Sequence, residues 1–271
     1  MTRSRTYLLT AIAAVLFVAL TWVLGSQDLF YKNWWDSAEV AYGDSAIFTY
    51  GLLALIILAG VIQAQQLPPD GVNIELGAVT DTAGQTEDPK FWRLITGNVY
   101  YAVLWLPLRF FIGRQWITAG EHKLRSSGWM SGGTSLKNSW ERYTGDASQI
   151  HYDWYHHFLT YMLNHEWYTW FAKVIAVGEF LVGLGLLVGA LVGIAAFFGT
   201  LMNFSFMLAG TASSNPVLFG LSVFLILGWK VAGYWGLDRY LLPVLGAPWK
   251  AGKAFGGEGI HPRGRGGTVT A

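Results

Sequence analysis

The sequence predicts an all-α integral membrane protein with about six transmembrane helices. Hydrophobic residues make up 53% of the 271-residue chain and charged residues only 13%, which is about half the charged share of an ordinary soluble domain. The apolar residues form long continuous runs without the alternation of a half-buried strand, as in helices that cross a bilayer. The net charge of +1 argues against nucleic acid as a partner and leaves the lipid bilayer as the expected environment.

Residues 1–97 are expected to hold two transmembrane helices followed by a polar loop. The first span, residues 7–24, follows Arg3 and Arg5, and a cleaved secretory signal peptide would share this basic start and apolar core. The core is long for a signal peptide, and the sequence WVLG at its end is a poor cleavage site, so we favour a retained helix. The second span covers residues 45–62, and the acidic, turn-rich segment after it is expected to be a loop.

Residues 98–245 are expected to form the main membrane domain, with four further spans. These spans cover residues 98–119, 171–189, 191–212 and 216–235. The connection between the fourth and fifth spans is so short that the two helices must form a tight antiparallel hairpin.

An aromatic-rich insert, residues 121–170, separates the third and fourth spans and is expected to lie outside the membrane. It begins with a glycine-rich stretch and continues as a helical segment that suits the headgroup level of a bilayer. The aromatic residues behind this prediction are Trp140, Trp154, Tyr155, Trp167, Tyr168 and Trp170. The glycine-rich tail, residues 246–271, is predicted to be disordered.

An even number of spans places both termini of this multi-pass protein on the same side of the cell membrane. The basic residues near the termini favour the cytoplasm, and they are Arg3, Arg5, Lys250, Lys253, Arg263 and Arg265. The insert would then be extracytoplasmic, although it also carries basic residues, namely Lys123, Arg125, Lys137 and Arg142.

Two arginines, Arg109 and Arg114, lie within the third span, although an arginine at the bilayer centre costs about 3 kcal/mol on insertion scales. Glu179 in the fourth span can compensate them. Counted from the shared membrane edge, Arg109 lies roughly 16 Å deep, Arg114 about 9 Å and Glu179 about 12 Å. We therefore expect a buried Arg–Glu group, with Gly113 and Gly120 allowing a second helix to approach the third span closely.

The third span carries polar residues on two faces. Trp116 shares one face with Arg109, and His122 shares another with Arg114. A purely structural ion pair would specify which helices pack together. The alternative, a polar pocket for a headgroup or a proton path, is favoured because intramembrane charges are usually functional.

The sequence argues against several cofactors. It contains no cysteine, which excludes disulfides, iron–sulfur clusters, a thiol nucleophile and c-type haem attachment through this chain. No histidine lies at mid-span, which argues against a haem held by two helices. Asp153 and His157 could share a metal ion, but His165 lies about 12 Å further along the helix, so no metal site is expected. No phosphate-binding loop or dinucleotide fingerprint indicates a nucleotide.

Four motifs occur in the order found in a family of small bacterial and archaeal membrane proteins. They are LRFFIGRQWITAGEHKL, GEFLVGLGLLVGALVGIAAFFG, NFSFMLAGTASSNP and AGYWGLDRYLLP. On these motifs, residues 99–245 resemble the DoxX/DoxD family. The last two motifs are most similar to the DoxD branch, the large subunit of thiosulfate:quinone oxidoreductase. The first 97 residues and the length of the insert fall outside the resemblance.

The resemblance implies a DoxX-like four-helix bundle made by the third to sixth spans. It also implies electron transfer, in which thiosulfate is oxidised to tetrathionate and a membrane quinone is reduced. A small second subunit is the implied partner. The family arginine and glutamate correspond to Arg109 and Glu179, and Asp238 lies in the terminal Gly-Leu-Asp-Arg piece.

These observations predict a quinone-linked oxidoreductase subunit. The candidate catalytic residues are Arg109 and Arg114, which would hold the sulfur oxyanion or a quinone oxygen, and Glu179, which would relay a proton. The candidate substrate- or quinone-binding residues are Trp116, His122 and Asp238.

A non-catalytic scaffold subunit of a membrane redox or stress-defence complex is the alternative. In that case, the first two spans and the aromatic insert would be docking surfaces. A transporter is disfavoured, because the sequence shows neither an internal repeat nor broken helices in corresponding positions.

Overall fold

The computed structural model describes residues 1–34, 41–74 and 88–246, and this part of the chain consists of helices and connecting loops without a strand. The all-helical prediction is therefore confirmed for the described residues. Beyond Gly246, the tail that is predicted to be disordered lies outside them.

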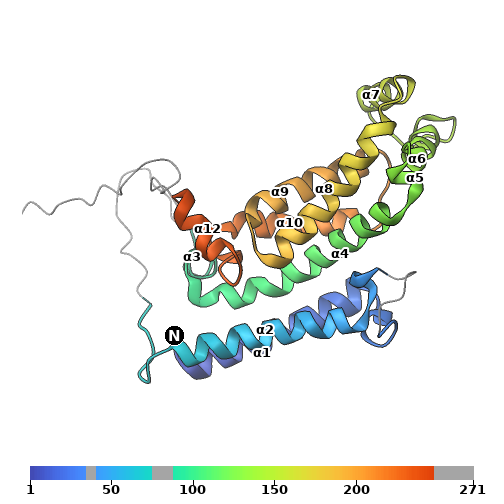
Figure 1. Cartoon of the computed structure of the whole chain (residues 1–271). Helices are drawn as coiled ribbons and strands as arrows, with labels where there is room; N and C mark the ends of the chain where they lie inside the picture. The colour runs from blue at the N-terminus through green and yellow to red at the C-terminus, as the bar shows by residue number, and fades with distance from the viewer. Residues whose placement is uncertain (35–40, 75–87, 247–271) are drawn as a thin grey trace, which may run out of the picture.

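The first two predicted spans form an antiparallel hairpin. Helix α1, Arg3–Leu20, is continued by the π-helical turn Thr21–Gly25, and α2 is Ala46–Gln66. Two short 3₁₀ helices, Gln27–Phe30 and Tyr42–Asp44, lie in the connection. The hairpin packs along one side of helix α4, and helices α8 to α10 lie on the other side (Figure 1).

The third predicted span begins after a sharp bend. Helix α3, Lys90–Gly97, meets the following helix at 85°. The chain then runs through the 3₁₀ helix Val99–Trp105 into α4, Leu106–Arg125. Phe110 near the start of α4 packs into an apolar cluster with Phe17 of α1, which holds the hairpin against the bundle.

The remaining long helices are α8, Tyr168–Val188, α9, Val192–Leu208, and α10, Asn215–Leu227. The short helices α11, Trp229–Ala232, and α12, Asp238–Leu245, follow. The predicted tight hairpin between the fourth and fifth spans is confirmed, because only Gly189–Leu191 separate α8 from α9. Gly189 ends α8 in the left-handed conformation, with φ +69°.

The contact between α4 and α8 confirms the close approach predicted at Gly113 and Gly120. A Cβ atom at Gly120 would lie 2.7 Å from the Cα atom of Phe180, and one at Gly113 would lie 3.0 Å from Cβ of Leu186. Gly183 of α8 provides the reciprocal space, because a Cβ atom there would lie 2.6 Å from the Cα atom of Ile117. The two backbones are therefore in direct contact.

The aromatic insert forms three short helices instead of one long helix. They are α5, Ser127–Met130, α6, Thr134–Thr144, and α7, Asp153–Asn164, and they cover one end of the bundle (Figure 1). Trp140 and Tyr155 are buried in a common apolar cluster with Tyr168 of α8. Trp154 and Trp170 are exposed, so the aromatic residues supply both a core and an outer surface.

Three described helices are long and apolar enough to cross a membrane, namely Arg3–Gly25, Ala46–Gln66 and Tyr168–Val188. The bent pair Lys90–Gly97 and Val99–Arg125 can supply a fourth span. These helices indicate a membrane protein. Helices α9 and α10 have only 17 and 13 residues, so the prediction of six full-length spans remains a proposal.

Gly228 follows α10 and lies against Trp105. Helix α10 ends at Leu227, and a Cβ atom at the following Gly228 would lie 2.5 Å from Cζ2 of the Trp105 ring. The chain turns at this glycine before α11 begins at Trp229.

Candidate functional site

Arg109 joins α4 to the loop that follows α11. The side chain is 1% exposed, and its Nη1 and Nη2 atoms donate to the carbonyl oxygens of Ala232 at 3.0 Å and Trp235 at 2.7 Å. The guanidinium also lies against Gly189, where a Cβ atom would be 2.7 Å from Nη1. Backbone carbonyls, rather than a carboxylate, therefore accept the hydrogen bonds of this buried cation.

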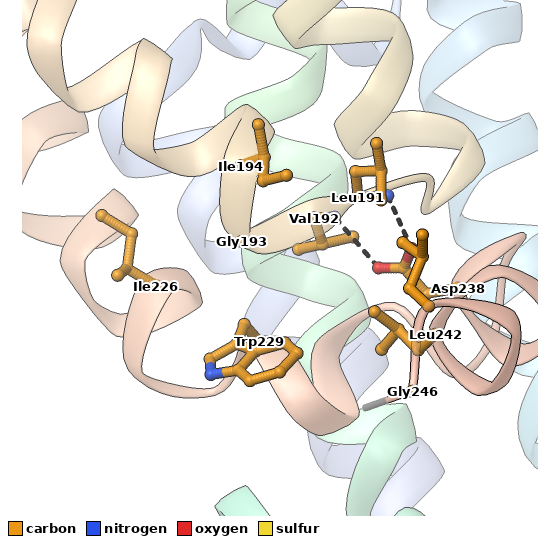
Figure 2. A pocket seen from close by; sticks show the side chains of 10 residues that line it. Leu191, Val192, Gly193, Ile194, Ile226, Trp229, Asp238, Leu242 and Gly246 are labelled. Atoms are coloured by element: carbon orange, nitrogen blue, oxygen red, sulfur yellow. Dashed lines mark hydrogen bonds between the residues drawn. The ribbon is translucent and has the colours of Figure 1, made fainter. Parts of the chain in front are cut away.

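Asp238 caps the beginning of α9. Its carboxylate oxygens accept hydrogen bonds from the backbone N–H groups of Leu191 at 2.6 Å and Val192 at 3.0 Å (Figure 2). Asp238 also lines a cavity of about 450 Å³ whose other walls, including Trp229 and Leu242, are mainly apolar (Figure 2). Such a cap satisfies helix N–H groups that would otherwise lack partners.

Arg114 faces the opposite side of α4, toward the α1–α2 connection. Its Nε atom donates to the carbonyl oxygen of Gly43 at 2.6 Å and its Nη2 atom to that of Ser45 at 3.2 Å, and Nη1 donates to the Thr49 hydroxyl. These bonds anchor the hairpin on α4.

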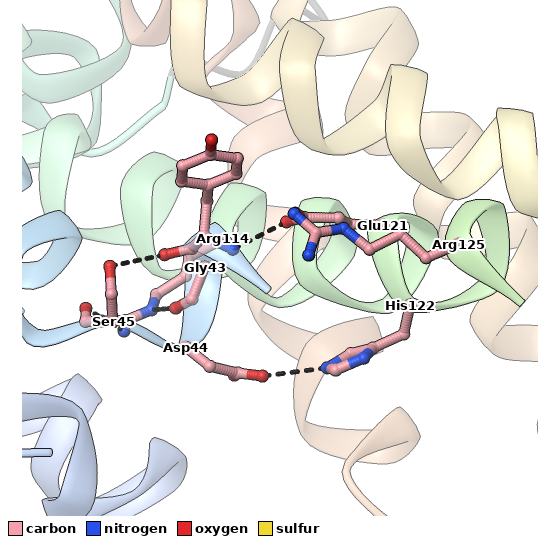
Figure 3. A network of polar contacts seen from close by, with 8 residues as sticks. Gly43, Asp44, Ser45, Arg114, Glu121, His122 and Arg125 are labelled. Carbon is pink, nitrogen blue, oxygen red and sulfur yellow. Dashed lines mark hydrogen bonds and ion pairs between the residues drawn. The ribbon is translucent and has the colours of Figure 1, made fainter. Parts of the chain in front are cut away.

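His122 and Glu121 continue the same network (Figure 3). The Nε2 atom of His122 lies 2.9 Å from the Asp44 carboxylate. Glu121 accepts a hydrogen bond from the backbone N–H of Tyr42 at 3.0 Å and is also paired with Arg125. Arg114 and His122 are thus brought together, but on the side of α4 that holds the hairpin.

The predicted pairing of Glu179 with an arginine is wrong. Glu179 is 1% exposed, and its carboxylate pairs with Lys123, whose Nζ atom lies 2.6 Å from Oε2. Counting residues from the membrane edge gives only the depth of each residue along its helix. The pairing depends on the direction in which each side chain leaves α4. Arg109 and Arg114 point toward other elements, whereas Lys123 in the last turn of α4 faces α8.

Glu179 and Lys123 line a chamber of about 520 Å³, together with Trp116. Its walls come from α4, α8, α9, α10 and the capping helices α5 to α7. Aromatic side chains form much of the lining, namely Trp129, Trp140, Tyr143, Tyr155, Phe158, Phe171 and Phe206. Of the six sequence-predicted site residues, the structure places Glu179 and Trp116 in this chamber.

Two buried polar groups of the chamber have no hydrogen-bond partner among the described residues. They are the amide of Asn203, which is fully buried, and the Nε1 atom of Trp116. Gly199, Asn203 and Phe206 share one face of α9 by their spacing. The Trp116 indole packs on this face, because a Cβ atom at Gly199 would lie 3.0 Å from Nε1 and the ring centroid of Phe206 is 6.5 Å away.

An unpartnered buried amide costs about 1–3 kcal/mol. Such groups are rare in folded proteins and need an explanation. Here both residues, Asn203 and Trp116, line the same cavity. The arrangement can bind a ligand that has hydrogen-bonding oxygen atoms on a flat, apolar body.

Tyr155 and Lys123 close the chamber toward the capping helices. The Tyr155 hydroxyl donates to the carbonyl oxygen of Ser205 at 2.9 Å, and burial raises the pKa of this hydroxyl. The hydroxyl therefore stays protonated at neutral pH. The Nζ atom of Lys123 lies 5.0 Å from the ring centroid of Trp129, in a cation–π contact.

Sequence reasoning missed Lys123 and Asn203. The sequence predicts that Lys123 is a basic residue of the insert, because the third span is expected to leave the membrane near Gly120. Asn203 is the one amide side chain in the fifth predicted span. This isolated polar residue in an apolar run was a signal that could have identified it.

No three His, Asp or Glu side chains within the described ranges lie close enough together to hold a metal ion. Comparison with models of protein families, with curated proteins and with solved structures gave no match. The geometry of the chamber therefore carries the functional argument.

Proposed function

We propose that this chain is the membrane-embedded subunit of a quinone-linked oxidoreductase, and that the quinone ring binds in the chamber. The observation that carries the proposal is the juxtaposition of unpartnered buried groups, on Asn203 and Trp116, with the Lys123–Glu179 ion pair. The chamber volume of about 520 Å³ lies within the range of small-molecule sites.

The residues present fit a quinone. Its carbonyl oxygens would accept hydrogen bonds from Nδ2 of Asn203 and Nε1 of Trp116, which are buried donors of the chamber without partners among the described residues. Aromatic walls, including Phe206 and Trp140, suit the flat faces of the ring. When bound, the quinone supplies the electron acceptor.

The ion pair is the proton-exchanging group of the chamber. Glu179 has 2% of its side chain exposed and Lys123 21%, so Lys123 connects the buried carboxylate with the more accessible end of α4. Two protons must reach the quinone oxygens together with two electrons. We assign their delivery to Nζ of Lys123 and the carboxylate of Glu179.

We propose thiosulfate, or a related sulfur compound, as the electron donor, on the basis of the resemblance to the DoxX/DoxD family. Two thiosulfates would be joined by a new S–S bond and release two electrons. Arg109 and Arg114 do not line the chamber, whereas Lys123 does, so Lys123 is the cation proposed to attract the anion. A small second subunit and cytoplasmic termini belong to the same proposal.

Replacement of Asn203 by leucine tests the proposed ring site. The chain is reconstituted in lipid nanodiscs, quinone binding is followed by quenching of tryptophan fluorescence, and quinone reduction is followed with thiosulfate as donor. Asn203→Leu should weaken quinone binding about 10-fold, the effect of one lost hydrogen bond to a buried ligand. Asn164→Leu, at an exposed position of α7, is the control and should bind normally.

Glu179→Gln separates binding from proton delivery. This variant should still bind quinone but should lose thiosulfate-dependent reduction. A wild-type chain that binds no quinone would contradict the proposal and favour the scaffold function. Quinone binding without thiosulfate turnover would retain the quinone site and reject thiosulfate as donor.

A further inference from the structure

A long apolar groove lies between α8 and α9, outside the chamber. It encloses about 430 Å³, and its lining is almost entirely hydrocarbon. Val174, Leu181, Ile194 and Phe198 stand along it, and each is about half exposed. In a membrane protein these exposed apolar side chains face lipid, so the groove opens toward the bilayer.

Two glycines create the space of this groove. Gly178 and Gly185 of α8 both line it. A Cβ atom at Gly178 would meet only the Sδ atom of Met202, at 3.7 Å. A Cβ atom at Gly185 would lie 3.2 Å from the carbonyl oxygen of Ala190 and 3.3 Å from Cβ of Ala195. Larger residues at these positions would fill the groove, whereas the glycines keep it open.

The groove adjoins the chamber. Phe171 and Ile175 of α8 line both cavities, on the side where the chamber contains Glu179. On α9, the consecutive residues Met202 and Asn203 line the groove and the chamber, respectively. The polar chamber and the apolar groove are thus two neighbouring parts of one region, and together they suit a ligand with a polar head and a long apolar tail.

We propose that the groove binds the isoprenoid tail of a membrane quinone whose ring occupies the chamber. This inference rests on the proposed function and makes it more specific: the substrate is a long-chain quinone drawn from the bilayer, and its tail follows α8 and α9 from Phe171 toward Leu191. Because Phe171 and Ile175 line both cavities, the groove is placed to hold the tail of a ligand whose head lies in the chamber, which favours the quinone tail over an unrelated lipid chain.

Gly178→Leu fills the groove, with only the flexible Met202 side chain near its Cβ atom. Gly220→Leu is the matched control, because no atom lies within 4 Å of a Cβ at that position of α10. Affinities are measured in nanodiscs for a long-chain quinone and for a tail-less quinone with the same ring. We expect Gly178→Leu to weaken long-chain binding at least 10-fold and to leave tail-less binding unchanged, and Gly220→Leu to affect neither ligand.

The outcomes distinguish the two levels of the proposal. If the wild type binds neither quinone, the proposed function fails. If it binds both quinones and Gly178→Leu weakens neither or both equally, the ring site stands and the tail site is overturned. Gly178→Ala, a smaller change, should give an intermediate loss and covers the case in which the leucine variant does not fold.

Photo-crosslinking identifies the occupant of the groove directly. A long-chain quinone with a photoreactive group in its tail should label α8 and α9 near Met202, and excess unlabelled quinone should prevent the labelling. A phospholipid with a photoreactive acyl chain provides the opposite test. If it labels the same residues and quinone does not displace it, the groove is a lipid site and the inference is wrong.

Discussion

Arg109 shows how a charge is accommodated inside this protein without a carboxylate bonded to it. Its hydrogen bonds are accepted by the carbonyl oxygens of Ala232, the last residue of α11, and of Trp235, which lies between α11 and α12. Hydrogen bonds to a charged group contribute about 1.5–3 kcal/mol each. Arg109 therefore acts as a tie between α4 and the C-terminal part of the described chain.

Arg109→Met should lower the free energy of unfolding by about 3 kcal/mol, because two buried carbonyls lose their donor. The measurement is thermal or denaturant unfolding in detergent, followed by circular dichroism. Arg5→Met, at an exposed position of α1, is the control and should change stability by less than about 0.5 kcal/mol. An equal loss of unfolding free energy in both variants would show that the hydrogen bonds of Arg109 do not contribute specifically to stability.

At the scale of elements, the contact between α4 and α8 depends on glycines that allow the backbones to touch. Gly183 lies against the backbone of Ile117, and Gly120 lies against that of Phe180. The same contact brings Lys123 beside Glu179. The position of the ion pair thus follows from the packing of two helices.

Gly183→Ala should force the two helices apart and destabilise the protein by about 1–3 kcal/mol. Gly178→Ala on the same helix is the control for helix propensity, since its Cβ has room and alanine is favoured over glycine in a helix by about 0.5–1 kcal/mol. The comparison is made by unfolding in detergent. Similar stabilities for the two variants would contradict a backbone contact at Gly183.

At the scale of the whole molecule, the protein consists of a helical hairpin docked on a bundle (Figure 1). The hairpin is held by the apolar cluster around Phe17 and by the hydrogen bonds of Arg114 to the segment from Gly43 to Thr49. The chamber lies on the other side of α4. Docking of the hairpin and ligand binding are therefore expected to respond to different substitutions.

Arg114→Gln should loosen the hairpin without unfolding the bundle. Hydrogen exchange should become at least 10-fold faster at residues 41–49, while α8 and α9 keep their protection, because the lost bonds join only α4 and the hairpin. Arg142→Gln on α6 is the control. Faster exchange across all helices would show instead that Arg114 supports the whole fold.

The sequence predicted the long apolar helices well, because each α-helix satisfies its own backbone hydrogen bonds and its apolar run can be read directly. The short connection predicts the hairpin at Gly189, and the small size of glycine predicts the close helix contacts at Gly113 and Gly120. The bend before α4 and the end of α10 at Gly228 were missed. At the end of α10, Gly228 lies against Trp105, a residue far away in the sequence.

By itself, the sequence determined the helical class, the membrane character and the presence of buried charge, since composition and periodicity express these properties. The tertiary structure decided which charges meet. The pairing of Glu179 with Lys123 instead of an arginine depends on the rotation of α4 about its axis, and counting residues along a helix cannot determine that rotation. The same packing encloses Asn203 and Trp116 in one chamber.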